Sequence, residues 1–430
     1  MTAAAQRPMS SGGRTLRVTL ISTLPPDKGL ADYTAHLAGG LAQTPGVSLE
    51  VIDFASLYPR RLYPGGELLD PTAQRPQWPS VRVRTMLRWY NPLSWVWAGL
   101  SARGDIVHAQ WWSYILAPTY LVALTLARLR RRRVIVTVHN VEPHESGRWR
   151  WLLNRLVLRL AHAYIVHDTR SRDALAEVVP AGKPIAVIYH GVLSSAGAER
   201  SALEARRALG VPADANVVLC FGNVRPYKGV DVLLRAFAAV RQRVPAARLV
   251  IAGKPWEDWA PYERLIAELG LRDAVDTHLG FVPAADVGTF FAAADVVALP
   301  YLQFDAQSGV GTRALHHGRA LVVTDAGGLP ELVSDPRAIV PSGDAGRLAE
   351  ALVAVLTDSA LRARLETASK ARAGELNWDS IAEQTVAFYQ TLVRGPARRA
   401  GSREPSSRTR ETPPFARSAC PKKGQPRERR

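Results

Sequence analysis

Short runs of Val, Ile, Leu and Ala alternate along the chain with longer stretches in which apolar residues recur at helical spacing. Runs that are apolar throughout predict strands buried on both faces, as in parallel sheets, and the stretches between them predict crossover helices. Val230, Leu233, Leu234, Phe237 and Val240, for example, have the spacing of a helix with one buried face. The pattern therefore predicts an α/β protein with doubly wound parallel sheets.

The predicted strands form two sets, separated by a segment rich in Ser, Ala and Glu at residues 193–207. Few contacts are expected to cross such a segment, so we place a domain boundary there. The first set is predicted at residues 15–22, 49–53, 105–109, 134–139, 163–166 and 185–189, and the second at 216–221, 248–252, 275–279, 296–299 and 321–324. Two facing doubly wound domains would form a cleft at the carboxyl ends of their strands, where such sheets bind ligands.

Composition agrees with a folded protein of two or three domains, because 47% of the 430 residues are hydrophobic and 22% are charged. A disordered or fibrous protein is excluded. Cys220 and Cys420 cannot make a disulfide framework, which favours a reducing compartment such as the cytoplasm. The start of the chain lacks the apolar region of a secretory signal, so no export is expected.

The net charge of +17 is distributed unevenly. Residues 1–190 hold 23 Lys and Arg against 12 Asp and Glu, residues 191–393 hold 20 against 23, and residues 394–430 hold 12 against 3. In the basic tail only Phe415 is interleaved with the charge, which favours a solvated tail over a nucleic-acid-binding arm. We therefore predict no nucleic-acid partner.

Residues 106–127 carry no Asp, Glu, Lys or Arg and are long enough to span a membrane. Their beginning has the pattern of a core strand, Pro118 suits the first turn of a helix, and another apolar strand follows at once. We therefore expect a buried strand and helix here.

The segment FGNVRPYKG, residues 221–229, places a Gly turn and two cations between a predicted strand and a helix N-terminus. Free N–H groups at the helix end, together with Arg225 and Lys228, predict an anion site that suits a diphosphate. The alternative is a solvated loop, but Gly222, Pro226 and Gly229 fix its course. There is no Walker motif and no GxGxxG in strand context, which argues against ATP and nicotinamide cofactors.

A second polar segment runs over residues 299–333. Asp305 lies in a loop ahead of a helix expected to start near Gly309, so its carboxylate and several free N–H groups share one place. A carboxylate there can hold sugar hydroxyls. Gly327 and Gly328 permit close backbone approach, and Glu331 follows them.

Histidines are abundant in the first half, and a metal site has to be weighed against the anion site. His139, Glu142, His144 and Glu145 lack ligand spacing on one helix face, so no metal is predicted. His144 and Glu145 either order their loop or border an acceptor pocket. His316 and His317 are expected at a helix C-terminus, where the dipole favours them.

These segments together resemble one known family. FGNVRPYKGVDVLLRAF, HLGFVP, FFAAADVVALPY, QSGV and GRALVVTDAGGLPELV match the retaining GT-B glycosyltransferases of glycosyltransferase family 4 in order and spacing. LPPDKGLADYTAHLA, DIVHAQWW, TVHNVEPHE and IYHGV are similar to the acceptor side of that family. The resemblance covers essentially the whole predicted folded length.

The resemblance implies a specific organisation of the chain. A flexible start, residues 1–14, would precede a Rossmann-like acceptor-side domain at 15–192 and a nucleotide-sugar-binding Rossmann-like domain at 208–376. A helix at 377–393 would cross back and pack on the first domain, and residues 394–430 would be a disordered basic tail.

The resemblance also implies roles for residues of the donor site. Arg225 and Lys228 correspond to the family's pyrophosphate-binding pair, although the usual Arg directly after Gly222 is here Asn223. Gly29 corresponds to the glycine loop that approaches the donor phosphates. The family places a histidine beside the donor sugar at the position of His139.

Further donor contacts are implied in the second domain. The loop of Gly280, Phe281 and Val282 resembles the one that holds the nucleotide base, and Ser308, Gly309 and Val310 belong to the QSGV stretch. The family often has two glutamates separated by seven residues, which are here Asp305 and Arg313. Because a guanidinium has donors only, Arg313 cannot accept from ribose hydroxyls, and backbone groups and Glu331 would have to hold the nucleoside.

The resemblance implies metal-independent, retaining transfer of a sugar from a UDP or GDP sugar to an acceptor hydroxyl, with no further cofactor. Eight of eleven tryptophans lie between Trp78 and Trp151, in the half with the excess of Lys and Arg, which suits contact with anionic membrane unless they are core residues. A lipid-linked glycan acceptor at the inner membrane face is the resulting hypothesis. The alternative is a catalytically weakened paralogue that serves as a nucleotide-sugar-binding or scaffold subunit of a glycan-assembly complex.

Overall fold

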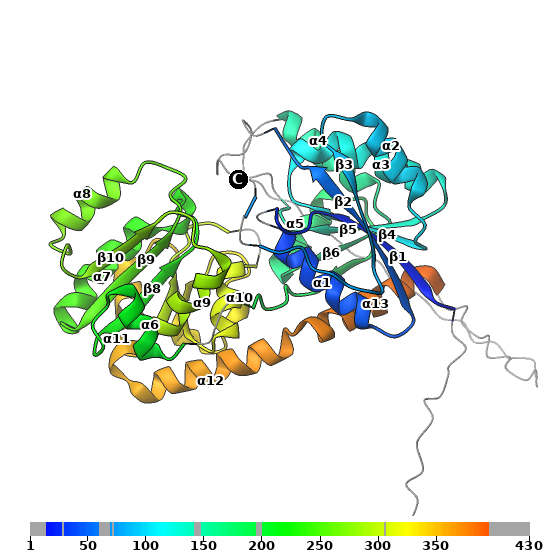
Figure 1. Cartoon of the computed structure of the whole chain (residues 1–430). Helices are drawn as coiled ribbons and strands as arrows, with labels where there is room; N and C mark the ends of the chain where they lie inside the picture. Colours follow the sequence, from blue (N-terminus) through cyan, green and yellow to red (C-terminus); the bar gives the residue numbers. More distant parts are fainter. Residues whose placement is uncertain are drawn as a thin grey trace, which may run out of the picture.

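The computed structural model of the chain describes residues 14–27, 30–59, 69–70, 73–141, 148–194, 200–304 and 307–394. It contains two fully parallel sheets with helices on both faces, one in each half of the chain (Figure 1). The predicted α/β class with two doubly wound sheets is confirmed. The predicted flexible start and basic tail fall almost entirely on residues outside these ranges and stay predictions.

The first sheet has seven strands in the order β3-β2-β1-β4-β5-β6-β7. They are β1 (Leu16–Ser22), β2 (Val47–Ser56), β3 (Arg82–Arg88), β4 (Ile106–Trp111), β5 (Arg133–Val138), β6 (Ala163–Val166) and β7 (Ile185–Val187). Helices α1 (Ala31–Gln43) and α13 (Trp378–Arg394) cover one face, and α2 (Pro92–Ser101), α3 (Ala117–Leu129), α4 (Arg148–Arg159) and α5 (Thr169–Val178) cover the other. The strand order reverses between β1 and β4, where such sheets bind ligands.

The second sheet repeats this winding with six strands in the order β10-β9-β8-β11-β12-β13. They are β8 (Asn216–Phe221), β9 (Ala247–Gly253), β10 (Val275–Leu279), β11 (Val296–Leu299), β12 (Ala320–Thr324) and β13 (Ile339–Val340). Helices α7 (Val230–Arg243), α8 (Ala260–Glu268), α11 (Ala345–Thr357) and α12 (Ser359–Glu375) pack on one face, and α6 (Ala202–Leu209), α9 (Ala284–Ala293) and α10 (Gly309–His316) pack on the other.

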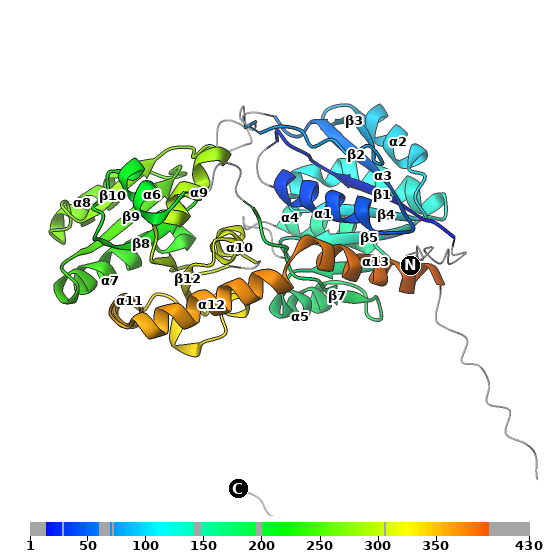
Figure 2. The same cartoon turned by 60° about the horizontal axis from the view of Figure 1, so that its bottom comes forward.

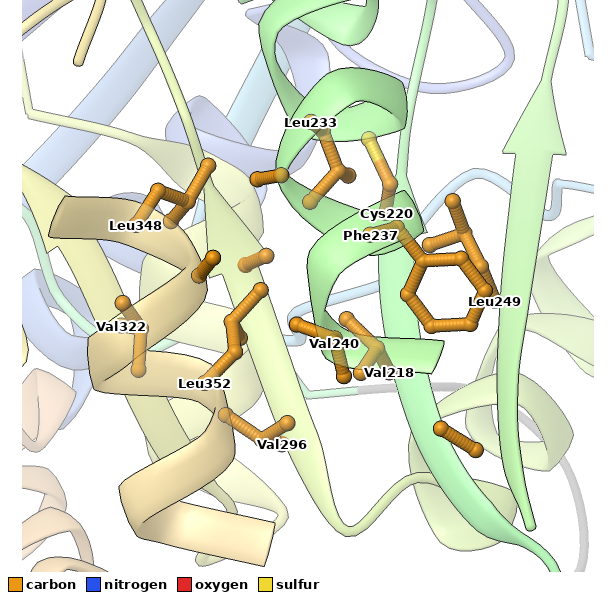
Figure 3. Packing of buried hydrophobic residues seen from close by; sticks show 14 of the residues in the cluster. Val218, Cys220, Leu233, Phe237, Val240, Leu249, Val296, Val322, Leu348 and Leu352 are labelled. Carbon is orange, nitrogen blue, oxygen red and sulfur yellow. The ribbon is translucent and has the colours of Figure 1, made fainter. Parts of the chain in front are cut away.

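The core between α7, α11 and the second sheet is apolar throughout (Figure 3). Phe237 and Leu233 of α7 pack towards the strands from the same side as Leu352 of α11. Cys220 lies in this cluster as a free thiol, and burial raises its pKa to about 11. It is therefore a core residue that stays protonated near neutral pH.

Strands β6, β8, β10 and β11 have the bounds that the sequence pattern predicts, whereas β3 and β13 were not predicted. Both are edge strands, and β13 has only two residues, too few for a recognisable apolar run. In β3 only Leu87 is fully buried, so its sequence RVRTMLR lacks the continuous apolar run of a central strand.

The uncharged stretch at residues 106–127 forms β4 and α3, with Pro118 in the first turn of the helix, as predicted. Among the described residues, no helix is both long and apolar enough to cross a bilayer. The boundary segment is shorter than predicted, because α6 begins within it at Ala202. Ser201 and Glu204 form a reciprocal capping box that fixes this start.

The chain returns to the first domain through its last two helices. Helix α12 lies along the second domain and α13 continues onto the first, where it packs beside α1 (Figures 1 and 2). Trp378, the first residue of α13, donates a hydrogen bond from Nε1 to the carbonyl oxygen of Val192 at 2.7 Å. The two connections between the domains are thereby fastened to each other.

Candidate functional site

The turn after β8 is shaped by two glycines with positive φ. Gly222 has φ +98° and Gly229 has φ +62°, a region that residues with a Cβ rarely adopt. A Cβ on Gly229 would lie 2.1 Å from the carbonyl oxygen of Pro300, so this glycine is also needed for close packing. The turn holds Lys228 between the end of β8 and the start of α7.

Lys228 is a buried cation, with only 7% of its surface exposed. Its Nζ lies 5.1 Å from the centre of the Tyr301 ring and 2.9 Å from where a Cβ of Gly222 would be. Within the described part of the chain this ammonium makes no ion pair or hydrogen bond, and burial lowers its pKa. A buried ammonium without an anionic partner is costly, which indicates a site for an anion.

The N-terminus of α10 lies beside this ammonium. Val310, in its first turn, approaches the position of a Gly222 Cβ to 3.1 Å, and Ser308 caps the helix by accepting from the N–H of Gly311 at 3.2 Å. Gly309 is the first helical residue. The free N–H groups at this end of the helix favour the binding of a negatively charged group. Cation, glycine turn and helix end together form a cradle for phosphate oxygens.

Arg225 directly precedes the short helical turn Pro226–Lys228. Its guanidinium carbon stands 3.6 Å from the centre of the Trp256 ring, and the N–H of Trp256 donates to the carbonyl oxygen of Val224 at 3.0 Å. Stacking on an aromatic ring orients a guanidinium and lowers its freedom. Sequence reasoning missed Trp256, because it follows β9 and meets Arg225 only through the pairing of β8 with β9. Asn223 is exposed at the tip of the turn.

A cavity of about 420 Å³ opens next to the predicted base-binding loop. Gly280, Phe281 and Val282 line it together with residues of α6 and α9. Phe281 is 43% exposed at its rim. The predicted loop thus borders a hollow with an aromatic side chain at its rim, and its role in holding a base stays a prediction.

Arg313 does not point into an open ribose site in this structure. It donates to Asp32 of α1 at 3.1 Å and to the carbonyl oxygen of Ser194 at 2.8 Å. Burial lowers its pKa, and the Asp32 carboxylate opposes that shift. The residue that replaces the family's second glutamate therefore joins the two domains.

Glu331 also contacts the first domain. Its Oε1 accepts from both the N–H and the hydroxyl of Thr169, at 3.1 and 2.6 Å, at the start of α5. Gly328 lies so close to Asp168 that a Cβ there would come within 2.9 Å of the Asp168 side chain. The carboxyl ends of the two sheets consequently face each other across direct contacts, as two facing Rossmann-like domains require.

His139 follows β5 and lies in a cluster of buried aromatic rings. Its Nε2 lies 2.7 Å from Gln110 Oε1, and its Nδ1 lies 3.2 Å from His167 Nε2. The Tyr33 ring stands edge-on at 4.9 Å, and His190 lies next to His167 at 5.6 Å between ring centres. The sequence singled out His139 but not His167 or His190, which come from separate strands.

Burial keeps this cluster neutral near pH 7. It lowers the pKa of His190 and of the neighbouring His108 to about 3 and that of His167 to about 4, and it lowers the pKa of His139 strongly as well. Among the described residues, no group of three or more His, Cys, Asp or Glu side chains is placed to hold a metal ion. Gly29, Asp305, Glu142, His144 and Glu145 lie outside the described residues, so their predicted roles stay predictions.

The buried histidines make stability depend on acid pH. We expect the free energy of unfolding to fall as the pH decreases from about 6.5 towards 4. In this range histidines bind protons in the unfolded chain, whereas burial keeps them neutral in the folded protein. Each histidine contributes a slope of about 1.4 kcal/mol per pH unit in this window. Urea unfolding of wild type and His108→Gln between about pH 7.5 and 4.5 measures the slope. An equal slope in both proteins would contradict the neutral state of His108.

Comparison with known proteins supports the resemblance found in the sequence. The family model described as "Glycosyl transferases group 1" matches residues 215–358, and the one described as "Glycosyltransferase Family 4" matches residues 28–193. The D-inositol 3-phosphate glycosyltransferase of Saccharomonospora viridis is 28% identical over 67% of this chain and 70% of its own. That of Stackebrandtia nassauensis is 34% identical, but the match spans only 48% of each chain.

Solved structures show the same fold. Anabaena HepE in complex with UDP and glucose aligns with a TM-score of 0.66 and 20% identity, covering 88% of this chain and 100% of HepE. Sucrose-phosphate synthase from Thermosynechococcus elongatus aligns with a TM-score of 0.65, also at 20% identity, over 88% and 99% of the two chains. Each half of the chain matches one family model, in order, on this two-domain scaffold. The chain therefore belongs to glycosyltransferase family 4 and has the GT-B fold.

Proposed function

We propose that the protein transfers a sugar from a UDP or GDP sugar to an acceptor hydroxyl with retention at the anomeric carbon and without a metal. The observation that carries this proposal is the buried, unpaired ammonium of Lys228 beside the N-terminus of α10. A nucleoside diphosphate fits it, because two phosphates supply the missing negative charge and the neighbouring cavity at Phe281 suits a base.

In the proposed reaction, the acceptor oxygen bonds to the anomeric carbon while the bond from that carbon to the β-phosphate oxygen breaks. The acceptor proton passes to the departing phosphate on the same face, so the configuration is retained and no protein nucleophile is needed. Negative charge grows on the diphosphate during this step. Lys228, Arg225 and the α10 N–H groups would stabilise that charge more in the transition state than in the ground state.

The donor is identified by a thermal-shift panel of UDP, GDP and ADP with UDP-glucose, UDP-N-acetylglucosamine and GDP-mannose. A nucleotide that binds the folded state raises the unfolding temperature in proportion to the logarithm of its concentration. We expect a UDP or GDP compound to do so and ADP not to. A panel without any shift at millimolar concentrations would reject the proposed function.

Arg313 favours a second candidate, a paralogue that binds a nucleotide sugar but has lost most transfer activity. Arg313 stands where the family often has a glutamate, and it forms an ion pair with Asp32. Release of nucleoside diphosphate from the bound donor separates the two candidates. Release that depends on an acceptor supports the transferase, whereas binding without release under any acceptor supports the paralogue.

We further propose that the helical layer α2–α3–α4 contacts anionic membrane, which would bring the enzyme to a lipid-linked glycan. This layer exposes large apolar side chains, with Leu93 at 78%, Trp97 at 61%, Leu129 at 73% and Trp149 at 78%. Exposed arginines lie in and next to the same helices: Arg103, Arg130, Arg131, Arg155 and Arg159. Aromatic and apolar groups beside cations suit the interface of an anionic bilayer.

The test is co-sedimentation with phosphatidylcholine vesicles, with and without phosphatidylglycerol. We expect binding only to the anionic vesicles, decreasing with salt, and a loss of about tenfold in the double variant Leu93→Gln, Trp97→Gln. Leu203→Gln, an exposed leucine of the second domain, serves as the control. Equal binding by the double variant and this control would contradict the membrane proposal.

A further inference from the structure

Gln307 is a buried side chain at the contact between the domains. Only 6% of its surface is exposed, and its Oε1 accepts a hydrogen bond from the backbone N–H of His190 at 2.5 Å. Its Nε2 is shielded from solvent and has no hydrogen-bond partner among the described residues. The amide oxygen therefore bonds the first domain, whereas the amide nitrogen donates no hydrogen bond to any described residue.

The orientation of this amide follows from its partner. A backbone N–H can only donate, so the carbonyl oxygen of Gln307 must face His190, and the NH₂ group must point the other way. Buried polar groups in folded proteins are nearly always hydrogen-bonded, because an unmet donor costs about 1–3 kcal/mol. An orphaned NH₂ group at the contact between the two domains thus indicates an acceptor that the protein alone does not supply.

The position of Gln307 limits what that acceptor is. The next residue, Ser308, caps α10, whose first turn lies beside Gly222 and Lys228. On its other side, His190 lies next to His167, which bonds His139. Gln307 consequently lies between the phosphate cradle of the second domain and the histidine cluster of the first.

We propose that Nε2 of Gln307 donates a hydrogen bond to a hydroxyl oxygen of the sugar that is transferred, and that it helps to select this sugar. This inference rests on the proposed function. A neutral amide suits a hydroxyl, because Lys228 and the free N–H groups of α10 already meet the charge of the phosphates. Since Oε1 stays on His190, the same side chain links sugar binding to the contact between the domains.

Two ligand pairs are available, UDP with UDP-glucose and GDP with GDP-mannose, and the pair that binds wild type more tightly is used. The test compares the binding of this pair to Gln307→Leu and to wild type. Isothermal titration calorimetry gives both dissociation constants. We expect the variant to bind the nucleotide sugar about tenfold more weakly and the free nucleoside diphosphate within twofold of wild type, since only the sugar hydrogen bond is lost. Gln242→Leu, an exposed glutamine on α7, is the control and should leave both constants unchanged.

Gln307→Glu keeps an oxygen for His190 and replaces the NH₂ group by an acceptor, so it tests the donor role if Gln307→Leu fails to fold. Under the proposal it too weakens the nucleotide sugar more than the nucleotide. An equal loss for both ligands, or no loss for either, would overturn the assignment of Gln307 while leaving the proposed function intact. Absence of binding by wild type to every pair would reject the proposed function itself, and the assignment of Gln307 with it.

Discussion

Replacing Lys228 by alanine is expected to lower kcat/KM for sugar transfer about ten- to a hundredfold. The lost interaction is a charge-assisted contact with the departing diphosphate, which is worth about 1.5–3 kcal/mol. The same variant should not lose stability, because the ammonium is buried without a partner in the described structure and its removal relieves a desolvation cost. Steady-state kinetics and urea unfolding of the same preparations measure both effects.

Two further variants test whether the expected loss of kcat/KM comes from the buried charge of Lys228. Lys228→Met keeps the apolar stem that packs beside Tyr301, so it separates the charge from the volume. Arg235→Ala removes an exposed cation from α7, the helix that follows Lys228, and should leave kcat/KM unchanged. Unchanged turnover in Lys228→Ala, or an equal loss in Arg235→Ala, would show that the buried ammonium does not serve the leaving group.

Replacing Gly229 by alanine is expected to destabilise the second domain by about 3 kcal/mol. About 1 kcal/mol comes from a Cβ in the left-handed region at φ +62°, and the rest from displacing the Pro300 carbonyl, whose oxygen lies 2.1 Å from the new atom. Urea unfolding measures the change. Because the residue follows Lys228, we also expect reduced donor binding in whatever fraction remains folded.

Gly270 offers a matched control for this substitution. It has φ +67°, almost the same backbone conformation, but a Cβ there would meet no atom within 4 Å. Gly270→Ala should therefore cost only the backbone strain, about 1 kcal/mol. If both variants were destabilised equally, the close approach of Gly229 to Pro300 would not contribute, and the packing of this turn against β11 would need another explanation.

Local sequence was sufficient to predict the turn with Lys228. Its glycines, its cations, the preceding strand and the following helix are all consecutive in the chain, and each has a backbone preference of its own. The same holds for β6, β8 and β11, which are buried and apolar over almost their whole length because both of their faces are covered. The edge strand β3 escaped prediction because its exposed residues need not be apolar.

Contacts made across the domains could not be predicted in this way. The resemblance that put Arg313 at the position of a family glutamate gave no sign of Asp32, which is 281 residues away in sequence and forms its ion pair. Gln307 is an ordinary polar residue in the sequence. Only the tertiary structure shows that its oxygen accepts from His190 of the other domain and that its nitrogen is buried without a partner among the described residues. Trp256 likewise meets Arg225 only after β8 and β9 pair.

The sequence by itself determined the α/β class, the two sets of parallel strands and the glycine turn with its cations, because hydrophobic periodicity and backbone preference act over neighbouring residues. The tertiary structure decided that Lys228 is buried beside the N-terminus of α10, that three histidines from separate strands stand neutral together, and that Arg313 and Glu331 join the domains. Burial and pairing depend on which distant segments fold against each other, and this information is distributed over the whole chain.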